Sequence, residues 1–189
     1  MEAVFTLAYP EYIVAEEIAR HLHKADGYSV CIPLSRQQQG MDLLVHSLKT
    51  KKSATIQIKS SRAYPHLPSK KEPRAESFDY HLWFKALNPK VLAADFYAFV
   101  GLFPKRTIIH HRFSRARQPR NWWSQIIILL TSSEMRRFLR EMRGQRFFYI
   151  GFNMDLKRVE VTRGTPQPEI WTPFLLDKSI RKLSRFLKF

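Results

Sequence analysis

Short apolar runs of strand length, separated by polar turns and loops, are the feature that most limits the possible folds of this chain. Three of them follow one another at residues 28–34, 41–47 and 54–60, with a charged turn at residues 49–53 before the third. This order predicts three successive strands, the third paired back on the second. Further strands are predicted at residues 77–85, 95–103, 125–130, 146–153 and 156–162, the last two forming a hairpin.

Three segments show helical rather than strand signals. Residues 10–24 begin with a proline and repeat apolar side chains at helical spacing, which predicts a helix. Residues 131–134, Thr-Ser-Ser-Glu, form a capping box that opens a predicted helix to about residue 142. Residues 176–189 predict a basic amphipathic helix. We therefore expect an α/β fold with a mixed β-sheet flanked by helices, followed by a C-terminal basic helix.

The chain of 189 residues, 44% of them hydrophobic and 13% aromatic, has enough apolar material for one core. We expect a single α/β domain over residues 1–165. Residues 166–189 are expected to form a basic amphipathic segment that packs on this domain or extends it.

Lysine and arginine outnumber aspartate and glutamate by 32 to 16, which gives a formal net charge of +16 at pH 7. So large a surplus repels itself in a compact fold, so it favours a polyanionic partner, either nucleic acid or an anionic membrane. Simple solvation of the surface is the alternative. Arginine binds phosphates in a bidentate manner and stacks on bases, and arginine occurs together with aromatic residues at 110–123. We therefore expect DNA as the partner, with RNA not excluded.

Basic residues concentrate in two predicted loops, at residues 62–76 and 110–121. Their side chains would neutralise phosphates, and an exposed Trp122 or Trp123 would stack on an unpaired base. The candidate nucleic-acid-binding residues are Arg62, Lys70, Lys71, Arg74, Arg112, Arg115, Arg117 and Arg120.

The single cysteine, Cys31, permits no disulfide within the chain, as is typical of proteins in the reducing cytosol. Because Cys31 lies in an apolar run, we expect it in the core. The longest apolar run, residues 126–130, is too short to span a membrane, and the first residues lack the basic start of a signal peptide. We therefore expect a cytoplasmic protein with no membrane partner.

Three polar residues on the second and third predicted strands form a candidate active site. Asp42 interrupts an apolar strand, and Gln57 and Lys59 alternate with Ile56 and Ile58, so both lie on one face of their strand. If the two strands pair, Asp42 lies near both. Carboxylate and amide oxygens are ligands that Mg²⁺ accepts, and a neighbouring lysine can orient water and offset charge on a phosphate. A plain Asp42–Lys59 ion pair is an equally weighted alternative.

The first predicted helix supplies a further carboxylate. Glu11 falls on the same helical stripe as the apolar Val14, whereas Glu17 points away from it. An inward carboxylate is costly unless it is paired or bound to a cation, so Glu11 is a candidate third oxygen ligand beside Asp42. An ion pair with Lys59 or an arginine is the alternative.

Glu11, the segment GMDLLV at residues 40–45 and the segment IQIKSS at residues 56–61 together resemble the PD-(D/E)XK nuclease superfamily, which has the restriction-endonuclease-like fold. In that superfamily a helix Glu, a strand Asp and a Glu, Asp or sometimes Gln bind Mg²⁺, and the Lys two residues later is catalytic. The resemblance implies that Glu11, Asp42 and Gln57 bind Mg²⁺ (or Mn²⁺) and that Lys59 is the catalytic lysine. It also implies a core of a helix, three antiparallel strands, a helix and another strand.

The resemblance is most specific over residues 1–60; the later segments resemble small uncharacterised bacterial members less specifically. Gln57 stands where most members have an acidic residue, which lowers the charge of the site. Residues 19–26 are longer than in compact members, so Glu17 stays an alternative to Glu11 as the helix ligand.

These observations predict an endonuclease that uses Mg²⁺ to hydrolyse phosphodiester bonds in DNA. Cleavage of both strands of a duplex would favour a homodimer. Two alternatives stay open: a non-catalytic nucleic-acid-binding protein on a nuclease-like scaffold, and a basic structural protein of a larger complex.

Overall fold

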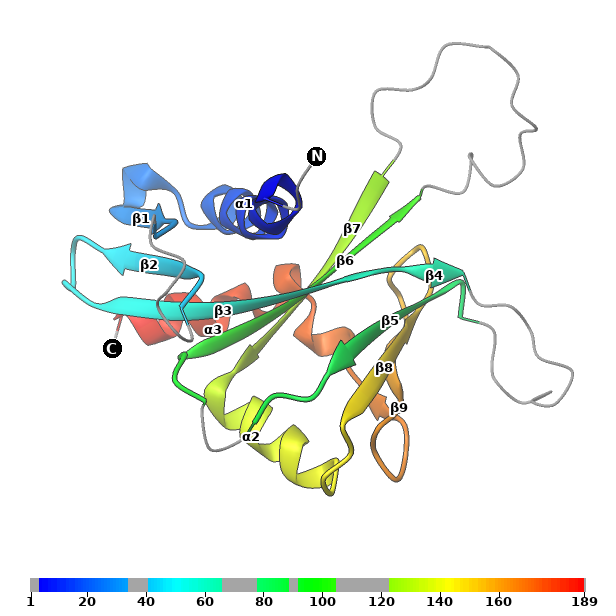
Figure 1. The fold of residues 1–189 in the computed structure, drawn as a ribbon. Helices are drawn as coiled ribbons and strands as arrows, with labels where there is room; N and C mark the ends of the chain where they lie inside the picture. Colours follow the sequence, from blue (N-terminus) through cyan, green and yellow to red (C-terminus); the bar gives the residue numbers. More distant parts are fainter. Residues whose placement is uncertain (1–3, 34–40, 66–77, 89–91, 105–122, 189) are drawn as a thin grey trace, which may run out of the picture.

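The computed structural model describes residues 4–33, 41–65, 78–88, 92–104 and 123–188. In these residues the chain forms two five-stranded sheets and three α-helices (Figure 1). The predicted α/β class is confirmed. The expected mixed sheet flanked by helices is the first sheet, and the second, antiparallel sheet was not expected.

The first sheet has the strand order β1-β2-β3-β6-β7. Its strands are β1 (Tyr28–Cys31), β2 (Leu43–Ser47), β3 (Ser53–Arg62), β6 (Phe96–Pro104) and β7 (Trp123–Thr131). β1, β2 and β3 form an antiparallel meander, β6 lies parallel to β3, and β7 returns antiparallel to β6. β6 is buried on both faces over its first six residues, which explains its unbroken apolar sequence.

The second sheet has the order β10-β9-β8-β5-β4 and is antiparallel throughout. Its strands are β4 (Tyr64–Pro65), β5 (Tyr80–Lys85), β8 (Phe147–Phe152), β9 (Val159–Arg163) and β10 (Glu169–Ile170). β3 continues into β4 through Ala63, whose N–H donates to the Leu102 carbonyl at 3.1 Å. One stretch of chain therefore runs along both sheets (Figure 1), and the predicted loop at residues 62–76 includes a short strand.

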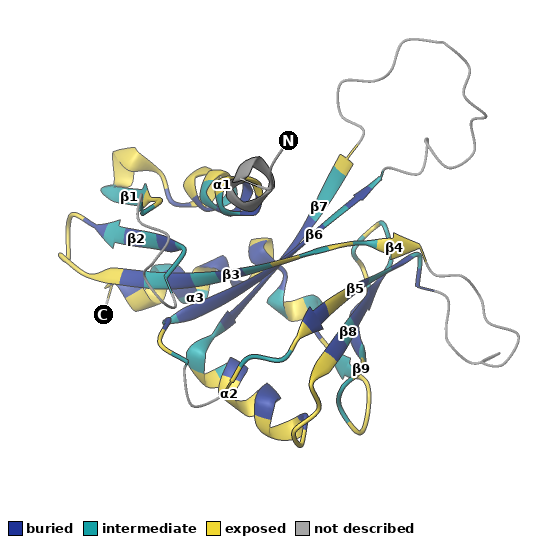
Figure 2. Ribbon diagram, viewed as in Figure 1, coloured by how far each residue is buried: buried dark blue, intermediate teal, exposed yellow. Residues whose placement is uncertain are grey.

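Two helices, α1 (Val4–His21) and α3 (Leu176–Lys188), cover one face of the first sheet. Val14 and Ile18 of α1 are fully buried in the same apolar cluster as Ile56 of β3. The apolar stripe of α3 joins this cluster, with Leu176, Ile180, Leu183 and Leu187 buried. Figure 2 shows the buried strand segments (dark blue) between these helices and the second sheet.

The other face of the first sheet packs against the second sheet through an aromatic cluster. Phe99 of β6 contacts Phe84 of β5 and Phe148 of β8, with ring centroids 4.9 and 5.5 Å apart. α2 (Ser132–Glu141) closes this cluster with Phe138, whose ring lies 4.8 Å from that of the fully buried Trp171. The predicted capping box of α2 is confirmed, since the Thr131 side chain and the Glu134 side chain each accept the other residue's backbone N–H.

Several local predictions differ from the structure. α1 begins at Val4 rather than Pro10, so Pro10 lies inside the helix instead of in its first turn. Cys31 is exposed rather than buried, since β1 is the edge strand of the first sheet.

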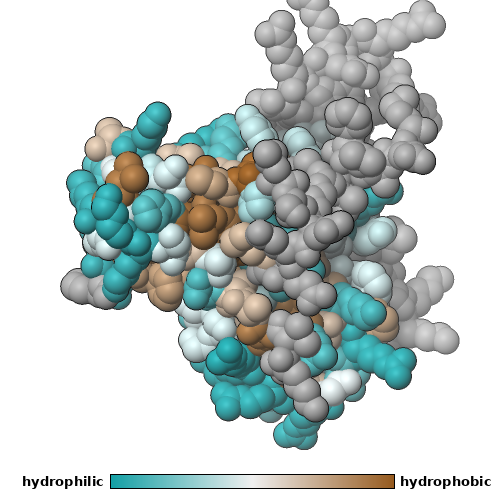
Figure 3. Space-filling model, turned by 60° about the vertical axis from the view of Figure 1, so that its left-hand side comes forward, coloured by the Kyte–Doolittle hydropathy of each residue, from teal (hydrophilic) through white to brown (hydrophobic). Residues whose placement is uncertain are grey.

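Figure 3 turns the β1–β2 side forward, and hydrophobic residues (brown) lie there among hydrophilic ones (teal).

Within the part of the chain that the structure describes, no helix combines the length and the apolar character needed to cross a membrane.

Candidate functional site

Asp42 lies directly before β2 and is fixed against the middle of β3. Its carboxylate Oδ2 accepts the Ile58 N–H at 2.6 Å, and its own N–H donates to the Ile56 carbonyl at 2.9 Å. The β2–β3 ladder ends at Leu43, which lies opposite Ile56. The Asp42 side chain therefore accepts a hydrogen bond from a β3 N–H just beyond the end of the ladder. Asp42 thus lies against β3, as the sequence predicts.

Gln57 and Lys59 lie on one face of β3, as their spacing predicts. Ile56 and Ile58 are buried on the α1 side, whereas Gln57 and Lys59 are half-buried on the other side. In the parallel register with β6, they lie opposite Tyr97 and Phe99, which belong to the aromatic cluster between the sheets. Gln57 and Lys59 thus face the side of the first sheet on which the second sheet packs.

Glu11 comes to the sheet from the opposite side. It is half-buried on α1, on the stripe of Val14 and Ile18, and this helix packs over the face that holds Ile56 and Ile58. The structure therefore joins Asp42 to β3 and places Gln57 and Lys59 on one face. It carries Glu11 on an element that covers the other face.

Glu17, the alternative helix ligand, is held elsewhere. Its Oε1 accepts Gln125 Nε2 of β7 at 3.2 Å and Arg20 Nη1 at 2.8 Å. Because β3 and β6 separate β7 from β2 in the sheet, Glu17 is engaged away from Asp42.

The alternative of an Asp42–Lys59 ion pair does not form in the described residues, whose ion pairs involve other side chains. In the same part of the chain, no group of three His, Cys, Asp or Glu side chains is arranged to hold a metal ion. The predicted set brings only two carboxylates and one amide. Such a set suits Mg²⁺, which keeps several water ligands and needs few from the protein.

Asp95, which the sequence analysis did not select, makes bonds of the same kind from the other neighbour of β3. Its Oδ2 accepts both the backbone N–H and the hydroxyl of Thr55 at 2.8 Å, and its own N–H donates to the Thr55 hydroxyl at 3.0 Å. An acidic residue directly before a buried strand is the sequence signal that Asp95 shares with Asp42. β3 is therefore held by one carboxylate on each side.

Of the candidate nucleic-acid-binding residues, Arg62 is exposed at the end of β3. Trp123, at the start of β7, is 62% exposed, so its ring is accessible for stacking. Trp122 and the other basic candidates, Lys70, Lys71, Arg74, Arg112, Arg115, Arg117 and Arg120, lie outside the described residues.

No family model, no curated protein and no solved structure matches this chain. The resemblance to nucleases therefore rests on the sequence motifs alone.

Proposed function

We propose that this protein is a Mg²⁺-dependent endonuclease that hydrolyses phosphodiester bonds in DNA, with its site at Asp42, Gln57 and Lys59. The observation that carries the proposal is the 2.6 Å hydrogen bond between the Asp42 carboxylate and the Ile58 N–H. This bond holds the Asp42 carboxylate against the segment of β3 that carries Gln57 and Lys59 on one face.

The chemistry of these side chains supports this reading. A carboxylate that accepts a backbone N–H through Oδ2 still has Oδ1 with which to bind a cation, and Gln57 adds an amide oxygen. When bound, Mg²⁺ would polarise the scissile phosphate and activate a water. Lys59, two residues from Gln57, would orient that water and offset the charge that develops on the phosphate. Glu11 would have to complete the ligand set from α1, which covers the opposite face of the sheet.

The strand order supports a restriction-endonuclease-like core in part. α1 precedes three antiparallel strands, and the next strand of the same sheet, β6, lies parallel to β3. Where the resemblance implies a helix between the third and fourth strands, the described residues form β4 and β5 instead. The net charge of +16 fits a nucleic-acid substrate.

The second candidate function is nucleic-acid binding without cleavage. Two observations favour it: Gln57 brings no charge to the site, and the Asp42 carboxylate already has a structural partner in Ile58.

Cleavage of labelled single-stranded, duplex and branched DNA in Mg²⁺ or Mn²⁺ tests the proposal. We expect Asp42→Asn and Lys59→Ala to lose at least about a hundredfold in rate, as is usual when a metal ligand or a charge-stabilising group is removed. Gln57→Glu should raise the affinity for the metal, because it adds a negative charge to the ligand set.

Asp95→Asn is the matched control, since Asp95 also binds β3 through its backbone but lies outside the predicted ligand set. It should cleave at the wild-type rate. Equal losses in Asp42→Asn and Asp95→Asn would show a structural effect rather than loss of a ligand. Salt-sensitive binding without any cleavage by the wild type would establish the second candidate function instead.

A further inference from the structure

The outer face of the second sheet carries aromatic and basic side chains. Along β5 and β8 the inward residues, such as Leu82 and Ile150, are buried in the aromatic cluster. Because side chains alternate along a strand, the residues between them point away from the core. We define the outer face by four outward residues of β5 and β8 and by one residue each of β4 and β9 on the same side: Trp83, Lys85, Phe147, Tyr149, Tyr64 and Arg163.

Three aromatic rings of the outer face are exposed, and two of them stack on each other. Trp83 and Phe147 are 42% and 41% exposed, and their rings stack with centroids 4.9 Å apart and planes 21° apart. Tyr64, on β4, is 58% exposed. Large apolar groups that stay together in water mark a surface that binds a partner.

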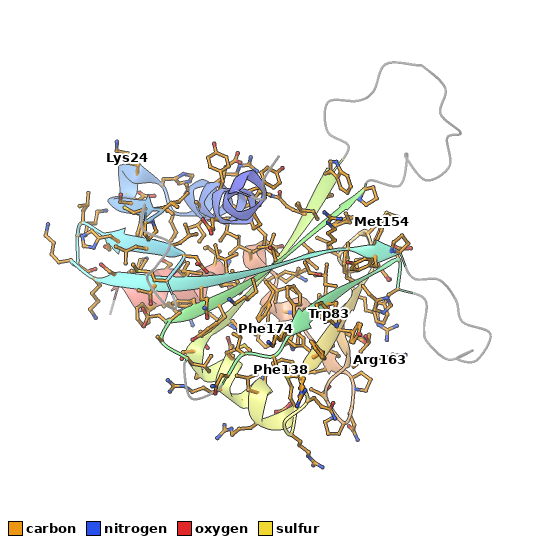
Figure 4. All side chains as sticks on the ribbon, viewed as in Figure 1. Lys24, Trp83, Phe138, Met154, Arg163 and Phe174 are labelled. Atoms are coloured by element: carbon orange, nitrogen blue, oxygen red, sulfur yellow. The ribbon has the colours of Figure 1, made fainter. Side chains whose placement is uncertain are left out.

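Basic groups lie beside these rings. Lys85 is exposed on β5, and the Arg163 guanidinium lies 5.8 Å from the centre of the Tyr149 ring. Trp83 and Arg163, labelled in Figure 4, come from β5 and β9 on either side of β8. Glu160, on β9 opposite Gly151 of β8, is paired with Arg158, whose Nε donates to it at 2.6 Å. The outer face is therefore both aromatic and positively charged.

We propose that the outer face binds single-stranded nucleic acid, with the exposed rings of Trp83 and Tyr64 stacking on unpaired bases and Lys85 and Arg163 binding the neighbouring phosphates. Exposed rings on a sheet can stack on successive unpaired bases, and cations beside them neutralise the backbone. A duplex does not offer this contact, because its bases stack on one another. The proposal rests on the proposed function only in taking nucleic acid as the partner.

Two other occupants fit the outer face less well. A second copy of this chain would place Lys85 and Arg163 against the same positive charges, which disfavours a two-fold contact. A membrane-binding face buries a broad apolar area that includes Trp, Phe and Leu side chains, whereas the leucine and isoleucine side chains of β5 and β8 point inward. Unpaired bases match both the rings and the charge.

The outer face lies on the other side of the chain from the candidate nuclease site. Tyr64 and Trp83 point away from the aromatic cluster, whereas Gln57 and Lys59 point toward its side of β3. The Trp83 N–H donates to Ser61 Oγ at 3.2 Å, two residues after Lys59, so the rate of duplex cleavage is measured beside the oligo-dT affinity of every outer-face variant.

Fluorescence anisotropy of labelled oligo-dT of about 12 nucleotides, within the range of single-strand site sizes, measures this binding. Trp83→Leu keeps an apolar contact with Phe147 but removes the stacking ring, so it should weaken oligo-dT binding about tenfold. Affinity for a duplex of the same length should not change. Trp83→Phe should restore most of the single-strand affinity, which a purely structural role of Trp83 would not require.

Phe186→Leu is the matched control, since Phe186 is 44% exposed but lies on α3. It should bind oligo-dT like the wild type. The proposal is overturned if Trp83→Leu binds oligo-dT normally, or if it loses single-strand and duplex affinity equally. It is also overturned if the outer face instead holds anionic vesicles or a second copy of the chain that Trp83→Leu releases.

Failure of the nuclease proposal looks different from these outcomes. A wild type that binds oligo-dT through Trp83 but cleaves nothing supports the outer face and removes only catalysis. If Trp83→Leu cleaves DNA at the wild-type rate and binds oligo-dT with unchanged affinity, the outer-face proposal is wrong and the nuclease proposal is unaffected.

Discussion

Asp42 and Asp95 hold β3 from its two neighbouring strands with the same kind of bond. Each lies directly before a strand, and each carboxylate accepts a backbone N–H of β3, that of Ile58 or that of Thr55. A buried N–H left without an acceptor costs about 1–3 kcal/mol. Asp42 therefore stabilises the fold whether or not it also binds a metal, and its two roles have to be separated by substitution.

Replacement of Asp42 by alanine and by asparagine separates them. Asp42→Ala leaves the Ile58 N–H unpaired, so we expect the free energy of unfolding to fall by about 1–3 kcal/mol. Asp42→Asn retains an acceptor oxygen and should lose less than about half of this. Urea unfolding at pH 7, followed by circular dichroism, measures both. An alanine variant as stable as the wild type would show that the bond contributes nothing net.

The sequence was sufficient to select Asp42 but not Asp95. Asp42 interrupts an apolar run shortly before a Gln-x-Lys segment, and strands that follow one another usually pair. Asp95 bonds with Thr55, which lies 40 residues earlier on a parallel neighbour. A parallel register depends on contacts distant in sequence, so no local pattern reveals it.

At the scale of elements, Glu134 connects α2 to both β7 and α3. Its carboxylate accepts the Thr131 N–H at the start of the helix and binds Lys182 Nζ of α3 at 2.5 Å. Burial alone would raise the pKa of Glu134, but the hydrogen bonds from Lys182 and Thr131 outweigh it and hold the pKa below its ordinary value of 4.5. The ionised form is therefore favoured in the folded state.

This lowered pKa predicts how the contribution of Glu134 depends on pH. Stability from a carboxyl with a depressed pKa is present above about pH 4.5 and is lost as the pH falls through the folded value. Glu134→Gln should cost about 0.5–1 kcal/mol at pH 7, because both partners are partly exposed, and the difference should shrink below pH 4.5. Urea midpoints across this range provide the measurement. Glu141→Gln, whose contact with Arg137 is exposed and 3.8 Å long, should show no such trend.

Elements with a full period were predictable from the sequence, whereas short ones were not. The capping box and the stripe of Leu176, Ile180, Leu183 and Leu187 located α2 and α3 closely. β4 and β10 have two residues each, too few for any period, and they exist because a longer strand lies beside them. The outer face could not be predicted from the sequence either, because its residues come together only when β5, β8 and β9 lie side by side.

At the scale of the whole molecule, the two sheets approach closely at Gly101 of β6. A Cβ at this position would lie 2.4 Å from Leu82 Cδ2 of β5 and 2.9 Å from Ile126 Cγ2 of β7. Real Cβ atoms do not come so near, so the packing between the sheets requires a residue without a side chain here.

Gly101→Ala should therefore force β5 and β6 apart. We expect a loss of about 1–3 kcal/mol in the free energy of unfolding, the usual cost of overpacking a core. Thermal unfolding measures it, and Gly144→Ala is the matched comparison, since a Cβ there meets nothing within 4 Å. Because Gly144 has a positive φ of 82°, its loss should come from backbone strain alone. Adding Leu82→Ala should rescue Gly101→Ala only, and no rescue would contradict the packing argument.

The shared cluster of α1 and α3 has a consequence for the order in which the protein can be built on the ribosome. α1 and the β1–β3 meander emerge early, but the face they share is finished by Leu183 and Leu187 of α3. Until residue 188 has left the exit tunnel, the apolar side chains of β2, β3 and β7 beneath α3 have no cover. A nascent chain that lacks α3 therefore exposes an apolar surface, to which chaperones that hold unfolded chains can bind.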